Sequence, residues 1–221
     1  LVNDLIKKDR RFCRNSSQSS QPYFYAACIQ EKNGNPDSVL YYLKRALSRN
    51  PGDPWILSHL AVHTGEQIYK ERIARYFNEI DAAYFIGQAS LANKKFEAAV
   101  QNFSYVTTIM PEYRDGFIYY AFALSGLQRY SEAAQSYIRA MQIRTEPIFK
   151  EKESIGIFRG WVAQEPENVQ AKRFLASILA DFGYYDESII ELGELKAQFP
   201  DEKYYENRIL QLMEFKKRYG Y

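Results

Sequence analysis

The chain of 221 residues is 46% hydrophobic and 25% charged, which is typical of a folded protein rather than a disordered one. Its formal net charge of +2 is too small to predict nucleic-acid binding. No stretch approaches the roughly 18 consecutive apolar residues of a membrane span, so we expect no transmembrane helix.

The two cysteines, Cys13 and Cys28, are too few for a disulfide framework. They lie in neighbouring segments and could pair in an oxidising compartment. We favour two separate thiols, with Cys28 partly buried.

The helices are predicted from apolar spacing and from turn residues, in chain order. Residues 1–14 are predicted to form a short amphipathic helix, which a Ser- and Gln-rich tract ends. A second helix begins at Pro22 and reaches Lys32, and the turn at 33–36 leads into a third, which ends at Asn50. The same order of helix, turn and helix then recurs, with predicted helices at 55–63, 67–78, 81–92, 96–109, 114–127, 131–143, 169–182, 186–198 and 202–218.

Residues 146–168 do not follow this pattern. Pro147 and Pro166 bracket an apolar segment that is too short for a helix pair. We interpret it as a truncated unit with a short first helix and a break near residues 154–156. One continuous helix is the alternative.

Small and aromatic residues recur in matched positions thirty-four residues apart. A period of this length is typical of helix hairpins that stack side by side and share one continuous core. Small residues at the matched positions allow two helices to approach closely, and rings fill the space between units. The matched pairs are Gly87 and Ala121, Phe96 and Tyr130, Ala99 and Ala133, Phe103 and Tyr137, and Val106 and Ala140.

These residues resemble the tetratricopeptide repeat, in which a small residue, a turn aromatic and an Ala–aromatic–Ala pattern precede a closing proline. The resemblance implies an all-α fold, a right-handed α-solenoid of stacked helix-turn-helix repeats over residues 20–202. Residues 1–19 would then form an N-terminal helix and linker, and residues 203–221 a C-terminal capping helix. The expected units are 20–53, a shortened 54–79, 80–113, 114–147, a truncated 148–168, and 169–202.

Motifs of catalysis and metal binding are absent from the sequence, including phosphate loops, nucleophile elbows and paired-cysteine metal motifs. His59 and His63, the two histidines of the chain, lie four residues apart on one helical face. A metal site needs a third ligand, and Leu60 follows His59 where the HExxH motif has Glu. We therefore expect no catalytic residue, no metal and no cofactor.

A binding surface is the expected functional feature. The resemblance implies that the first helix of each unit lines a concave groove for a protein or peptide segment. Some members grip a terminal carboxylate with Lys and Asn, where this chain has Phe24 and Cys28, or Tyr84 and Gln88. An aromatic groove favours an amphipathic helix or an extended apolar segment instead. The predicted groove residues are Phe24, Cys28, Trp55, Tyr84, Gln88, Ile118, Phe122, Arg173 and Ser177.

We thus expect a non-catalytic protein-interaction scaffold or adaptor within a larger assembly. The alternative is a structural spacer or oligomerisation region of a longer protein, suggested by the absence of a starting Met and by the first predicted helix. Less favoured is binding of nucleic acid or an anionic membrane through basic residues at both ends. The partner and the compartment stay open, with the bacterial cell envelope, the periplasm and the cytoplasm all compatible. The basic residues are Lys7, Lys8, Arg10, Arg11, Arg14, Lys216, Lys217 and Arg218.

Overall fold

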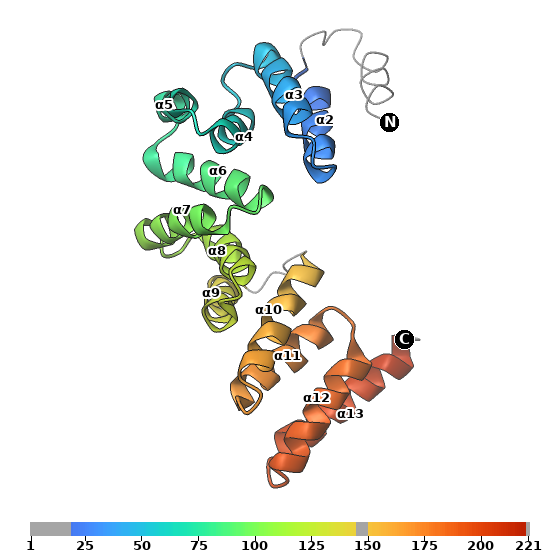
Figure 1. Cartoon of the computed structure of the whole chain (residues 1–221). Helices are drawn as coiled ribbons and strands as arrows, with labels where there is room; N and C mark the ends of the chain where they lie inside the picture. The colour runs from blue at the N-terminus through green and yellow to red at the C-terminus, as the bar shows by residue number, and fades with distance from the viewer. Residues whose placement is uncertain (1–18, 145–149, 220–221) are drawn as a thin grey trace. The chain divides into compact units, whose positions relative to one another are not determined.

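A computed structural model describes residues 19–144 and 150–219 of the chain, and these ranges are all-α, with twelve helices and no strand (Figure 1). The helix predicted at 1–14 and Cys13 lie outside the described residues. The residue contacts divide the chain into two compact units, residues 1–112 (unit 1) and residues 113–221 (unit 2). The period predicts one continuous core across the repeats, and this stays a prediction.

The described part of unit 1 contains three helix hairpins. Within it, α2 packs on α3, α4 on α5, and α6 on α7, while α3 and α6 both also contact α4. Each hairpin therefore rests against its neighbour, as expected for stacked repeats. The helices are α2 (Gln21–Lys32), α3 (Pro36–Arg49), α4 (Pro54–Thr64), α5 (Gln67–Tyr76), α6 (Glu79–Ala92) and α7 (Phe96–Ile109).

Local sequence explains where these helices begin and end. The Asp53 carboxylate accepts hydrogen bonds from the backbone N–H groups of Trp55, at 3.0 Å, and Ile56, at 3.3 Å, which caps α4. The Asn78 side chain caps α6 in the same way. The turn after α4 places Gly65 at a φ of 72°, a left-handed conformation that glycine adopts without strain.

The close approach predicted at Gly87 is confirmed. A Cβ added there would lie 3.0 Å from the Phe103 ring and 3.2 Å from the Asn102 Cβ. Helices α6 and α7 therefore approach each other so closely that only glycine fits at position 87 without a shift of its neighbours. Phe103 and Ala99, which the repeat matches to Tyr137 and Ala133, are both fully buried. Burial of such a ring is worth about 2 kcal/mol.

Where the structure describes unit 2, it contains two hairpins, a single helix between them and a final helix. In it, α8 packs on α9, α10 lies against α8, α9 and α11, and α12 packs on both α11 and α13. Ala121, Ala133 and Tyr137, which match residues of unit 1, are buried here too. The helices are α8 (Arg114–Gly126), α9 (Tyr130–Ile143), α10 (Glu151–Gln164), α11 (Val169–Asp181), α12 (Tyr185–Gln198) and α13 (Lys203–Tyr219).

The segment that does not follow the repeat forms one continuous helix, α10, over Glu151–Gln164. The break expected near residues 154–156 is therefore wrong, and the alternative of a continuous helix is right for the residues that the structure describes. The Tyr137 hydroxyl donates to the Ser154 Oγ at 2.9 Å, and the Phe158 ring packs edge-on against Tyr137. These contacts hold both sides of Gly156 on one helix against α9.

The last helix, α13, covers the end of the unit 2 core. Tyr205 and Leu212 are buried against Ala176, Leu192 and Leu195. Among the described residues, no helix is both long and apolar enough to cross a membrane.

Candidate binding cleft

A cleft of 810 Å³ opens in unit 1 between α2 and α4, which we call the α2–α4 cleft. The start of α3 and the turn after α6 complete its walls. Its position follows from the hairpin geometry, because α2 and α4 are the first helices of successive hairpins. The residues that line the cleft include Phe24, Cys28, Glu31, Trp55, His59 and His63.

Aromatic side chains form the apolar part of the cleft. Phe24 is half-buried and packs edge-on against the His59 ring, with 5.2 Å between ring centroids. Trp55 packs edge-on against Phe85 yet keeps 41% of its surface exposed. The indole is thus fixed on one side and available to a ligand on the other.

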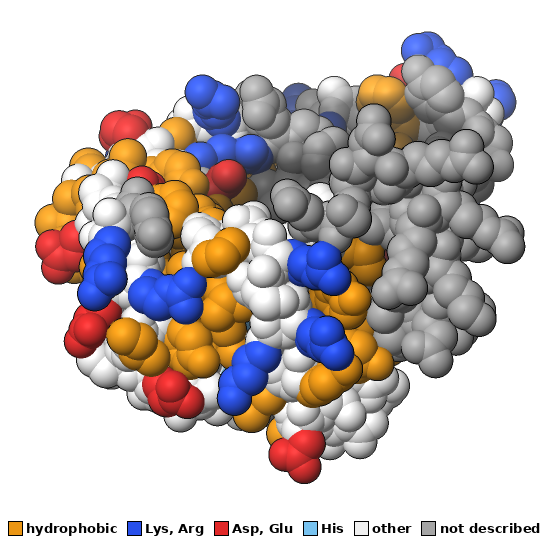
Figure 2. Space-filling view, turned by 90° about the horizontal axis from the view of Figure 1, so that it is seen from above, with side chains coloured by type: hydrophobic (Ala, Val, Ile, Leu, Met, Phe, Trp, Pro, Cys, Tyr) orange, Lys and Arg blue, Asp and Glu red, His pale blue; other side chains and the backbone are white. Residues whose placement is uncertain are grey.

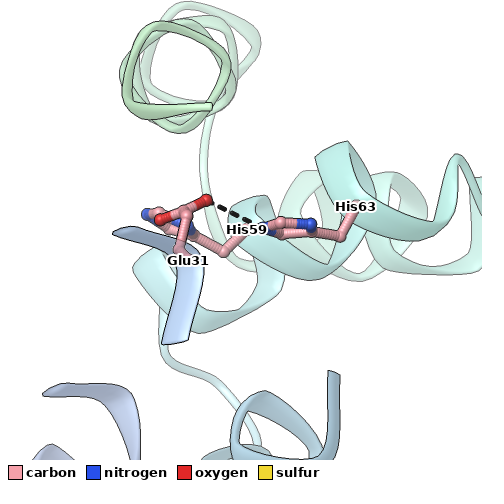
Figure 3. Close-up of side chains that lie close together, drawn as sticks. All are labelled: Glu31, His59 and His63. Carbon is pink, nitrogen blue, oxygen red and sulfur yellow. Dashed lines mark hydrogen bonds and ion pairs between the residues drawn. The ribbon is translucent and has the colours of Figure 1, made fainter. Parts of the chain in front are cut away.

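Polar side chains form a compact group at the same place (Figure 3). The His63 Nε2 lies 2.9 Å from the Glu31 Oε1, and the His59 ring lies beside them. Burial lowers the pKa of His59, an effect that the Glu31 charge opposes, and His63 lowers the pKa further. Burial also raises the pKa of Cys28, with a further contribution from the charge of Glu31. Cys28 is a half-buried free thiol.

Three of the nine predicted groove residues, Phe24, Cys28 and Trp55, line the α2–α4 cleft. Two more belong to unit 1 but lie elsewhere. Tyr84 is half-buried and packs its ring edge-on against Phe85 and Phe103. Gln88 is buried, and its Oε1 has no hydrogen-bond partner among the described residues.

The four remaining predicted residues belong to unit 2. Ile118 and Phe122 are only 7% and 6% exposed, so they offer little surface to a partner. Arg173 and Ser177 line a small pocket of 190 Å³. The Arg173 guanidinium donates to the Tyr205 hydroxyl at 2.6 Å and to Glu202 at 2.6 Å, which ties it to the last helix.

Sequence reasoning missed the contribution of Glu31. The spacing of His59 and His63 was visible, but the third polar group comes from a different helix. The Glu31 contact with His63 spans 32 positions of the chain, and no motif joins the two residues. Tertiary packing alone brings them together.

The basic residues near the two ends of the chain give little support for a surface that binds nucleic acid or an anionic membrane. The Lys216 Nζ contacts the Asp186 carboxylate, at 2.6 Å from its Oδ2. The basic residues of the N-terminal segment lie outside the described part of the chain. On the described part of the face drawn in Figure 2, exposed hydrophobic side chains separate the Lys and Arg side chains, which do not form a continuous basic patch.

No family model matches this chain, and no curated protein is similar to it. Solved structures do resemble it. PilW, a widely conserved type IV pilus biogenesis factor, is 12% identical with a TM-score of 0.47, over 94% of this chain and 90% of PilW. The tetratricopeptide-repeat protein TTC0263 of Thermus thermophilus is 15% identical with a TM-score of 0.34, over 88% of this chain and 99% of that protein.

The TPR2AB domain of yeast Sti1, solved in complex with pHSP90, is 18% identical with a TM-score of 0.27, over 96% of this chain and 74% of that domain. The described residues form an all-α fold of helix hairpins packed in series within each unit, which agrees with the fold that the resemblance to tetratricopeptide repeats implies.

Proposed function

We propose that this chain is a non-catalytic protein-interaction scaffold that binds a segment of another protein in the α2–α4 cleft. The observation that carries this proposal is the Trp55 indole, which is 41% exposed on the wall of an 810 Å³ cleft. Large aromatic side chains at the centre of a concave surface are typical anchors of protein interfaces. The edge-on contact with Phe85 holds the ring in place before a partner arrives.

The chemistry of the cleft indicates what kind of segment it would bind. Phe24 and Trp55 favour a large apolar side chain between them. The exposed side chains of Lys32 and Lys94 lie at the rim, on α2 and on the turn after α6. A segment that carries an apolar anchor next to acidic residues satisfies both features, and its charges would mainly steer association.

The test compares two exposed aromatic residues of the same hairpin stack. Candidate segments come from cross-linking in cells that produce the protein, and their synthetic peptides are then titrated into the purified chain. We expect Trp55→Ala to weaken peptide binding at least tenfold, since anchors of this kind contribute about 2 kcal/mol or more. Tyr25→Ala is the matched control, because Tyr25 lies on α2 and is 57% exposed but does not line the cleft. Equal affinity of the Trp55→Ala variant and the wild type would contradict the proposal.

A second candidate function, a spacer or oligomerisation region within a longer protein, is favoured by the outer side of α13. Leu210 and Met213 lie three residues apart on this helix and are 55% and 53% exposed. Adjacent exposed apolar residues on a terminal helix are typical of a surface that another subunit or repeat covers.

Light scattering tests this second candidate. Point variants are preferable to removal of α13, since truncation would uncover Leu192 and Leu195. If α13 forms an interface, the wild type elutes as an oligomer and the double variant Leu210→Ser with Met213→Ser elutes as a monomer. A wild-type chain that is monomeric at high concentration argues against self-association through α13.

A further inference from the structure

Three side chains that commonly bind transition metals converge in the α2–α4 cleft. His59 and His63 lie one helical turn apart on α4, and Glu31 reaches them from α2 (Figure 3). Each residue offers one ligand atom, and the three atoms lie within 4.8 Å of one another. The group differs from an ordinary acidic cluster because two of its three donors are imidazole nitrogens.

We propose that Glu31, His59 and His63 form a binding site for one divalent transition-metal ion, of which Zn²⁺ is the most suitable. Tetrahedral Zn²⁺ has bonds of about 2.0–2.1 Å to nitrogen and oxygen, which places neighbouring ligand atoms about 3.3–3.4 Å apart. The His63 Nε2 and the Glu31 Oε1 are 2.9 Å apart, and one ligand atom from each of the three residues lies within 4.8 Å of the other two. We expect side-chain rotation to bring the three atoms to the required spacing when an ion binds.

The surroundings hold the three side chains near this geometry. His59 is only 6% exposed, and the edge-on contact with Phe24 fixes its ring. The side chains of His63 and Glu31 are 17% and 19% exposed. Partly buried ligands lose less conformational freedom when they bind an ion than ligands on mobile surface side chains.

The donor set determines which ions suit the site. Two imidazoles and one carboxylate favour Zn²⁺, Co²⁺, Ni²⁺ or Cu²⁺ over Mg²⁺ and Ca²⁺, which prefer oxygen ligands. Three protein ligands leave a fourth position for water or for a side chain of a bound segment. Because Leu60 follows His59, the glutamate that serves as general base in HExxH peptidases is missing, so the site is suited to holding an ion rather than to hydrolysis.

The experiment uses the full chain without a histidine tag. Calorimetric titration with ZnCl₂, and with CoCl₂ followed by visible absorption, should give one ion per chain, while MgCl₂ gives no binding. Glu31→Gln and His63→Gln should each weaken Zn²⁺ binding at least tenfold, since even indirect partners of metal ligands contribute 10- to 100-fold. Glu97→Gln is the matched control, because Glu97 is an exposed carboxylate outside the cleft.

The histidine count makes the result easy to interpret, since the chain has two histidines and both belong to the proposed site. The thiols are tested separately by replacing Cys13 and Cys28 with Ser. Binding that persists in this variant and falls in the Glu31 and His63 variants supports the site. The absence of one-to-one binding, or binding lost only with the cysteines, overturns it.

One further measurement and one feature of the titration keep these outcomes distinct. Circular dichroism melting of each metal-free variant checks that it remains folded, so that lost binding is not lost structure. The titration contains no peptide, so its result is independent of whether the cleft binds a protein segment.

Discussion

The Glu31 Oε1 on α2 lies 2.9 Å from the His63 Nε2 on α4, so one polar contact joins the first hairpin of unit 1 to the second. Both side chains are less than one-fifth exposed, which distinguishes the contact from the surface ion pairs of this protein. The Arg129–Glu132 pair, for comparison, has side chains that are 44% and 52% exposed. Partial burial reduces the screening of a polar contact by water and salt, so we expect this contact to contribute more to stability than a surface pair does.

The first prediction concerns this contact in the metal-free protein. Glu31→Ala should lower the free energy of unfolding by about 0.5–1.5 kcal/mol, because it leaves the partly buried His63 without its partner. Urea unfolding followed by circular dichroism measures the change. Glu97→Ala, which removes an exposed carboxylate, should change stability by less than about 0.5 kcal/mol. Equal effects of the two substitutions would contradict the role assigned to the contact.

The second prediction compares two glycines inside helices. Gly87→Ala should destabilise the fold by about 1 kcal/mol, because the new methyl group would press on the fully buried Phe103 ring. This overpacking exceeds the gain of up to about 1 kcal/mol that alanine brings to a helix. Gly156→Ala on α10 should instead stabilise, since its added Cβ would meet no packing neighbour within 4 Å beyond the nearby backbone of its own helix. Thermal unfolding of both variants measures the two opposite signs.

The third prediction concerns the buried amide of Gln88. Its Oε1 is buried without a hydrogen-bond partner in the described part of the chain, so it is desolvated without compensation. Gln88→Met keeps the length of the side chain and removes the whole amide, including the unpaired oxygen, and it should raise the free energy of unfolding by up to about 1 kcal/mol. Urea unfolding tests this. A loss of stability would mean that the amide makes a favourable interaction in solution.

The fourth prediction concerns the turn between α8 and α9. Gln128 has a φ of 59°, in the left-handed region, at the position where Gly183 has a φ of 83° in a later turn. Gln128→Gly should stabilise by about 0.5–1 kcal/mol, since it removes steric strain and keeps the backbone carbonyl that Gln164 contacts. Gly183→Ala should destabilise by a similar amount. The melting temperatures of the two variants measure this and should shift in opposite directions.

The fifth prediction concerns pH. Partial burial, and then the neighbouring Glu194, raise the pKa of Glu191, against the effect of Lys172 and Arg159. A raised folded-state pKa favours the protonated form. The contribution of Glu191 to stability is therefore greatest below its unfolded pKa of about 4.3 and is lost as the pH rises through the folded value.

The substitution Glu191→Gln removes the loss of stability that Glu191 causes as the pH rises. The variant should be more stable than the wild type at pH 7, by less than about 1 kcal/mol because the carboxyl is only half-buried, and the difference should shrink toward pH 4. Urea unfolding at both pH values measures it. Glu167→Gln, in the exposed loop before α11, controls for the substitution itself. A stability difference that grows toward pH 4 would contradict a raised pKa at Glu191.

Local sequence was sufficient to predict most helices. Proline, glycine and asparagine mark the turns, and residues such as Asp53 and Asn78 cap helices through contacts only two or three residues away. Such short-range interactions act whatever surrounds the segment, so they can be read from sequence. The thirty-four-residue period also predicted the close approach at Gly87 correctly.

Helix α10 shows where local signals were insufficient. Gly156 suggested a break, yet the segment is one helix because Ser154 and Phe158 both contact Tyr137 on α9. Glycine weakens a helix by only about 1 kcal/mol, and packing contacts on both sides exceed that cost.

The candidate site, like the helices, depends partly on local sequence and partly on tertiary packing. Phe24, Cys28 and Trp55, which helical register assigns to one groove, line a common cleft, but register could not show that Gln88, Ile118 and Phe122 are buried. Register tells which residues share one face of a helix, and only neighbouring elements determine how much of that face they cover. Sequence alone therefore determined the helix hairpins and their repeat. The tertiary structure decided which aromatic rings remain exposed and placed Glu31 beside the two histidines, because contacts between distant residues depend on how the hairpins pack.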